Sequence, residues 1–187
     1  MKLKTENIKN YDAFLESNRK RVNRYLNMVL WFFILTGPAI AIGIRTGVYT
    51  DIDYSTCINI SLVMFIVSLA HFALTKKWPK SIYTSCFALL ALNLLLVYMS
   101  YDHVAINLTW FIVPMLSILL CEIRVYFVFV GINYILMLQA TYLTAPYFIN
   151  PNSEYDSFAR TFANRVGGYT VEMVIMCVGG YAILYLA

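Results

Sequence analysis

The sequence predicts an all-α integral membrane protein, a bundle of six transmembrane helices with both termini in the cytoplasm. The chain of 187 residues is 60% hydrophobic and only 13% charged, whereas soluble domains are about 45–50% apolar and about 25% charged. Its mean hydropathy is +0.67. Apolar runs follow one another along the chain, and Lys and Arg gather in alternate connections, as in multi-span membrane proteins.

Residues 1–25 form a polar, basic segment ahead of the first apolar run. Its apolar residues recur at helical spacings, which is typical of one helix face. They are Ile8, Tyr11, Leu15, Val22 and Tyr25. We expect a short amphipathic helix that lies on the inner leaflet and enters the first span, although a solvated, positively charged anchor explains the basic residues equally well.

Residues 26–187 form the predicted membrane domain, because a helix crosses a bilayer with about 20 mostly apolar residues. In the first span, Gly37-Pro38 predicts a kink or a break. In the long loop 145–166, Phe158 and Phe162 predict a short surface helix. The six spans are expected at about 26–44, 57–75, 81–100, 107–121, 125–144 and 167–187.

The basic residues orient the bundle. With the N-terminus inside, eleven of the fourteen Lys and Arg residues lie on the cytoplasmic side, in residues 1–25, in the turn 76–80 and at Arg124. Only Arg45, Arg160 and Arg165 lie outside. Short loops rich in Lys and Arg stay in the cytoplasm, so both termini are predicted to be cytoplasmic and the protein to reside in the plasma membrane.

Known catalytic and metal-binding motifs are absent from the sequence. The four cysteines, Cys57, Cys86, Cys121 and Cys177, have no metal-type spacing and sit in or beside apolar runs, where a free cysteine behaves as a small apolar residue. We therefore expect no enzyme activity within this chain, no cofactor and no metal. The net charge of +4 is placed for a membrane surface, and no nucleic-acid partner is expected.

Polar residues concentrate in the outer half of the predicted spans. Polar side chains are costly in lipid, so they should face one another or a wet cavity. We therefore expect a small-molecule pocket open to the outside, while hydrogen bonds between helices are the alternative role of the amides. The candidate ligand-binding residues are Glu172, Trp110, Asn93, Gln139, Tyr142, Tyr169 and Asn59.

Glu172 is the most informative of these residues, because a carboxylate within a span costs more than an amide. It lies little more than a turn into the last span, which ends at Ala187 with no Lys or Arg after it. We expect the chain to continue into a cytoplasmic domain and this last helix to carry a signal to it.

Four stretches carry a resemblance to a known type of domain. They are NRKRVNRYLNMVLWFFILTGPAIAIGI, KKWPKS, YMSYDHVAINLTWFIVPMLSILLCE and GGYTVEMVIM. Over about residues 19–187 the chain resembles the six-helix N-terminal membrane module of sensory proteins from Gram-positive anaerobes. The resemblance implies a methyl-accepting chemotaxis domain or a GGDEF diguanylate cyclase domain downstream, dimerised through that cytoplasmic region, and it brings no defined ligand residues.

Two other functions remain open from the sequence. A small six-helix substrate-binding subunit of a vitamin transporter has the same length and topology, and it would co-purify with an energising partner. A structural anchor for a cytoplasmic enzyme needs none of the buried polar groups. We therefore expect a membrane-embedded sensory input domain first, and a transport subunit second.

Overall fold

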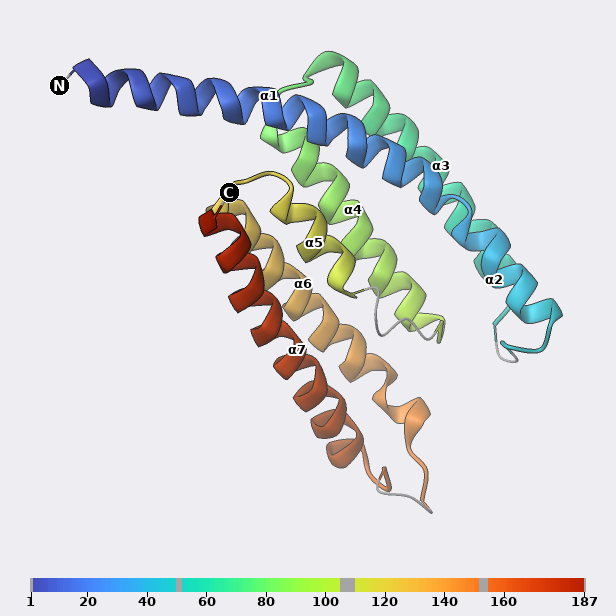
Figure 1. Ribbon diagram of the computed structural model, residues 1–187. Coiled ribbons are helices and arrows are strands. Elements are labelled where there is room, and N and C mark those ends of the chain that lie inside the picture. Colours follow the sequence, from blue (N-terminus) through green and yellow to red (C-terminus); the bar gives the residue numbers. More distant parts are fainter. Residues whose placement is uncertain (1, 50–51, 105–109, 152–154, 187) are drawn as a thin grey trace. The chain divides into compact units, whose positions relative to one another are not determined.

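The computed structural model describes residues 2–49, 52–104, 110–151 and 155–186, with the side chains described from residue 10 onward. All the regular secondary structure in this part of the chain is helical (Figure 1). Five helical stretches in it are long and apolar enough to cross a membrane. They are Asn10–Arg45, Tyr54–Lys77, Ile82–Tyr101, Ile123–Phe148 and Phe158–Leu186.

Helix α1 (Lys2–Phe33) joins the predicted surface segment to the first predicted span without a boundary. The helix expected over residues 1–25 thus enters the first predicted span as one continuous helix. The physical reason is that no Gly or Pro occurs before Gly37, so nothing interrupts the helical hydrogen bonds. Leu15 and Val22 of the predicted face are buried, while Tyr11 and Tyr25 are exposed; the side chain of Ile8 lies outside the described part.

The predicted break in the first span is present, two residues earlier than expected. Residues 34 and 35 form a turn between α1 and α2 (Thr36–Arg45). Pro38 has no N–H to donate to the carbonyl of Ile34, four residues back. The Ser61 hydroxyl, from α3 (Tyr54–Lys77), donates to that carbonyl at 3.0 Å, so the freed group has a partner inside the protein.

The next four helices end where a proline or a left-handed residue follows within three residues. Helices α3, α4 (Ile82–Tyr101) and α6 (Ile123–Thr144) lie close to the predicted second, third and fifth spans. The predicted fourth span, 107–121, holds only α5 (Ile112–Ile118), which ends ahead of Cys121, a residue with φ 55°. Residues 107–109 of that span lie outside the described part.

Helix α7 (Phe158–Leu186) begins nine residues before the predicted last span. Phe158 and Phe162 belong to its first turns, so the separate surface helix expected in loop 145–166 is wrong; that loop instead contains a short 3-10 helix, η2 (Ala145–Phe148). Hydropathy placed the boundary too late, because a helix continues through polar residues when no proline intervenes.

The chain divides into two compact units. Unit 1 comprises Met1–Ala91 with Leu119–Cys121, and unit 2 comprises Leu92–Ile118 with Glu122–Ala187. In unit 1, α1, α3 and the first half of α4 bury Leu26, Leu30, Ile60, Met64 and Leu89.

Asn23 of α1 joins the parts of unit 1 through buried hydrogen bonds. It donates to the carbonyls of Pro79 and Ser81 at 3.0 Å each and accepts from the Ser85 hydroxyl at 2.6 Å. Asn18, one turn earlier, donates to the carbonyl of Leu119 at 2.8 Å. The turn after α3 and the segment after α5 are thus both held by one short stretch of α1.

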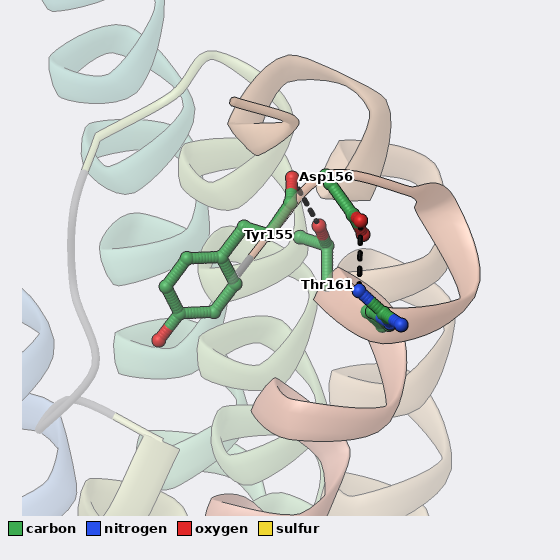
Figure 2. Close-up of polar contacts among 4 residues, drawn as sticks. Tyr155, Asp156 and Thr161 are labelled. Carbon is green, nitrogen blue, oxygen red and sulfur yellow. Dashed lines mark hydrogen bonds and ion pairs between the residues drawn. The ribbon is translucent and has the colours of Figure 1, made fainter. Parts of the chain in front are cut away.

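In unit 2, α6 and α7 are joined by two hydrogen bonds. The buried hydroxyl of Tyr126 donates to the carbonyl of Met176 at 2.5 Å, and Tyr134 and Thr170 share a hydrogen bond of 2.7 Å. Figure 2 shows the start of α7, where the Thr161 hydroxyl reaches the carbonyl of Tyr155 beside Asp156. These contacts fix the position of α7 against α6.

Candidate ligand-binding site

One face of α7 carries the two charged residues that line the cavities of unit 2. Arg165, Tyr169, Glu172 and Met176 are spaced four, three and four residues apart, which places them on the same side of a helix. Side chains from this face line two cavities, and both cavities lie within unit 2. Helix α7 therefore lines both cavities.

The first of these, the Arg165 cavity, has a volume of about 80 Å³. Since about 10–15 Å³ is enough to hold a water, this space suits several waters or a small organic molecule. It is lined by the end of α4, the residues after it, α6, η2 and α7. The lining residues are Ser100, His103, Val104, Trp110, Ala140, Thr141, Thr144, Phe148, Arg165 and Tyr169.

Arg165 is held in this cavity by an aromatic ring. Its guanidinium carbon lies 3.5 Å from the centre of the Phe148 ring, a cation–π contact. No carboxylate lies within ion-pair distance of Arg165 in the described part of the chain. The cavity therefore contains a permanent positive charge that an aromatic ring holds and no described acid neutralises.

His103 adds an unsatisfied polar atom to the same cavity. Its φ of 60° turns the chain sharply after α4, and its ring lies 4.0 Å from that of Tyr147, measured between centres. The buried Nδ1 atom has no hydrogen-bond partner among the described residues. A buried polar atom without a partner is costly, so a group bound in the cavity could stabilise it.

The second space, the Glu172 cavity, has a volume of about 20 Å³, enough for about one water. Glu172 stands at its edge, exposed in the single chain and without an ion pair among the described residues. Trp110 and Tyr169 line both cavities. The lining residues are Trp110, Phe111, Pro114, Asn133, Tyr134, Met137, Tyr169, Glu172, Met173 and Met176.

Asn93 and Asn133 form a buried pair behind the Glu172 cavity. The Asn133 amide donates to the Asn93 side-chain oxygen at 2.7 Å. The Asn93 amide nitrogen is buried and has no partner in the described part of the chain. Asn93 thus reaches the cavity only through Asn133, as an amide that joins α4 to α6.

The structure brings some predicted site residues together and leaves others apart. Trp110, Tyr169 and Glu172 line the cavities, and Asn93 adjoins them through Asn133. Gln139 is exposed and lines neither cavity. Tyr142, 57% exposed, packs against Phe158 and Phe162. Asn59 is an exposed residue of unit 1, a different unit from the cavities.

Several lining residues were not among the predicted site residues. On α6 they are Asn133, Tyr134, Met137, Thr141 and Thr144. Their spacings of three and four residues mark a single helix face. Applied to α6, that periodicity would have selected this face and left out Gln139, which is two residues from Met137 and so lies about 200° around the helix.

A third cavity, in unit 1, differs in character. It is an open groove of about 520 Å³ along α2 and α3. Its lining includes Pro38, Leu62 and Phe65 and contains no ionisable group other than Tyr54 and Cys57. Such a surface suits hydrocarbon rather than a polar ligand.

Metal binding has no support in the described residues. They contain no group of three or more His, Cys, Asp and Glu side chains placed to hold a metal ion. Cys57, Cys86, Cys121 and Cys177 form no disulfide within the described part of the chain. The polar chemistry of unit 2 therefore rests on Arg165, Glu172, His103, hydroxyls and amides.

The chain matches no family model, no curated protein and no solved structure. The resemblance to six-helix sensory modules therefore stays a prediction from the sequence.

Proposed function

We propose that this chain is the membrane-embedded input domain of a signal-transduction protein. A small molecule binds in the cavities of unit 2, and the last helix passes the signal to a cytoplasmic output domain. The observation that carries this proposal is that α7 contributes Arg165 and Tyr169 to one cavity and Tyr169, Glu172 and Met176 to the other. A ligand in either cavity touches the helix that would carry its signal.

The contacts between α6 and α7 give such a signal a mechanism. A ligand changes a conformational equilibrium only by its difference in affinity for the two states. The bond from Tyr126 to the Met176 carbonyl and the bond between Tyr134 and Thr170 fix α7 against α6. A ligand that favours a shifted α7 would work against these two bonds, and the displacement would continue to the end of α7.

Contacts within unit 1 support six spans with both ends in the cytoplasm. The stretch of α1 from Glu16 to Asn23 binds two segments, the turn after α3 through Lys80 and the Leu119 carbonyl after α5. Both segments then lie at the same side of the membrane as that stretch of α1. A chain that returns through α5 before α6 begins would satisfy these contacts, and the distribution of Lys and Arg predicts the same topology.

A return through α5 would need residues outside this helix, because its seven residues rise only about 10 Å. Irregular backbone is tolerated at membrane depth where protein surrounds it. Trp110, Val113, Pro114 and Ser117 are all buried, which fits a crossing enclosed by protein.

A reporter fusion tests the proposal. The chain is fused after Ala187 to a dimeric cytoplasmic reporter enzyme, and reporter output is screened against a small-molecule library in cells. We expect Trp110→Ala and Glu172→Gln to abolish the response of the wild-type fusion while membrane insertion is unchanged. Gln139→Ala, on a different face of α6, should respond normally.

Two results would contradict this account. A normal response in both cavity variants would remove the cavities from the mechanism. Ligand binding with no change in output from any fusion, in a protein that co-purifies with an energising partner, would favour the substrate-binding subunit of a transporter.

A further inference from the structure

We propose that the Arg165 cavity binds small organic carboxylates; this inference rests on the proposed function and names the class of ligand for its site. Three features of the cavity carry it: its charge, the availability of the Arg165 donors, and a lining that contains both polar and apolar groups.

The charge of the cavity favours an anion. Of the described residues that line it, Arg165 alone carries a permanent charge. Five residues earlier on α7, Arg160 forms an ion pair of 2.7 Å with Asp156 at an exposed site (Figure 2). Arg165 is less exposed and has no such partner among the described residues. An anionic ligand would supply the counter-charge that Arg160 already has.

The contact with Phe148 leaves the hydrogen-bond donors of Arg165 available. Guanidinium N–H groups lie in the plane of the group, whereas an aromatic ring contacts its face. The short distance of 3.5 Å between the guanidinium carbon and the ring centre describes a contact of this kind. Two parallel N–H donors match the two oxygens of a carboxylate, so the ring holds Arg165 without occupying the groups that would bind the ligand.

The remaining lining contains both polar and apolar groups. Polar groups come from Ser100, Thr141, Tyr169 and the Nδ1 of His103, which has no partner among the described residues. The indole of Trp110 and the side chain of Val104 provide buried apolar surface. A carboxylate on a short apolar body fits such a mixed lining, and a volume of about 80 Å³ limits the body to a few carbon atoms or one ring.

A cationic ligand is less suited than an anionic one to the Arg165 cavity. The carboxylate of Glu172 lines only the smaller cavity, beyond the shared side chains of Trp110 and Tyr169. A cation in the Arg165 cavity would face Arg165 and gain nothing from Glu172 within the same space. Organic amines therefore test the competing hypothesis, that the Arg165 cavity binds a cation.

Isothermal titration calorimetry on the full chain tests the proposal. The chain is placed in nanodiscs of phosphatidylcholine, which has no carboxylate in its headgroup. The probes are acetate, butyrate and benzoate, with acetamide, butyramide, benzamide and benzylamine as controls. We expect at least one carboxylate to bind about tenfold more tightly than its amide, because charge-assisted hydrogen bonds are stronger than neutral ones.

Variants of the two arginines locate the binding. Arg165→Gln should lose about tenfold in affinity for that carboxylate and bind it no better than the amide, whereas Arg160→Gln should bind as the wild type does. Arg165→Lys keeps the charge without the paired donors, so its affinity for the carboxylate should lie between those of Arg165→Gln and the wild type. If Arg165→Gln fails to insert, the Lys variant and the wild-type comparison of acid with amide still decide the question.

The proposal is overturned if no carboxylate binds, if amides or benzylamine bind as tightly, or if Arg165→Gln retains wild-type affinity. These results are separable from failure of the sensory role. Carboxylate binding that depends on Arg165, with no change in reporter output, would retain the ligand class and refute the sensor.

Discussion

The hydrogen bond between Asn93 and Asn133 shows what a buried amide pair does in unit 2. Asn93 is fully buried and its oxygen accepts from Asn133 at 2.7 Å. Replacement of one partner leaves the other amide buried without a hydrogen bond, while replacement of both by apolar residues removes the unsatisfied group. The pair therefore joins α4 to α6, as the alternative role considered for the amides anticipated.

A double-mutant cycle measures this pair. We expect Asn93→Leu and Asn133→Leu each to lower the free energy of unfolding by about 1 kcal/mol. The double variant should cost less than the sum of the two, with a coupling of about 0.6 kcal/mol, the usual value for such bonds in membranes. Thermal unfolding in detergent gives the four free energies; strictly additive losses would show that the two amides do not interact.

The direction of a side chain could not be predicted from the sequence. Trp110, Tyr169 and Glu172 were selected by depth and line the cavities, while Gln139 and Tyr142 were selected in the same way and line neither. Arg165 and His103 were not among the predicted site residues, because the start of α7 and the turn at His103 could not be located from hydropathy.

At the scale of the elements, the contact between α6 and α7 depends on Gly180. The Tyr126 side chain lies across this glycine, so that a Cβ at residue 180 would overlap its ring and hydroxyl. The same hydroxyl donates to the carbonyl of Met176. Gly179, next in the chain, has open space where its Cβ would be. Two adjacent glycines therefore have different structural roles.

This difference yields a matched pair of variants. Gly180→Ala should lower the free energy of unfolding by about 1–3 kcal/mol, because the Tyr126 ring has to move. Gly179→Ala should be neutral or stabilise the chain by up to about 1 kcal/mol, since alanine favours a helix over glycine. Thermal unfolding of both variants measures this difference. Equal losses of free energy of unfolding would contradict the packing of the Tyr126 side chain on Gly180.

The break between α1 and α2 shows how far an element boundary could be predicted. Gly37-Pro38 predicted an interruption, and residues 34 and 35 form it. The turn lies where it does because Pro38 has no N–H, which leaves the carbonyl of Ile34 without a backbone donor. The bond from Ser61 to that residue could not be predicted, because it joins residues 27 apart on two helices.

At the scale of the whole molecule, the topology makes a direct prediction about accessibility. In variants without the four native cysteines, single cysteines at Val48 and Tyr155 should react with a membrane-impermeant maleimide in intact cells. A cysteine at Trp78 should react only after permeabilisation, because Lys and Arg retain that turn inside. All three positions are exposed in the chain. Labelling of Trp78→Cys in intact cells would contradict the predicted orientation.

The composition was sufficient to predict a helical chain with several segments able to cross a membrane. In the fourth predicted span, the α-helix α5 has only seven residues, which is too few to cross a bilayer by itself. The long-range contacts of Asn18 and Asn23, which support the return of the chain, are not encoded in any local pattern.

The claim that a ligand in unit 2 acts on α7 is tested most directly by a distance between two spin labels. The labels are placed at Val128 of α6 and Ile183 of α7, both exposed, in a chain without native cysteines and in phosphatidylcholine nanodiscs. Saturation with the tightest-binding carboxylate should shift the distance by about 1–2 Å, the size of typical helix shifts in signalling, and Arg165→Gln should abolish the shift. An identical distance distribution with and without the bound carboxylate would contradict the account.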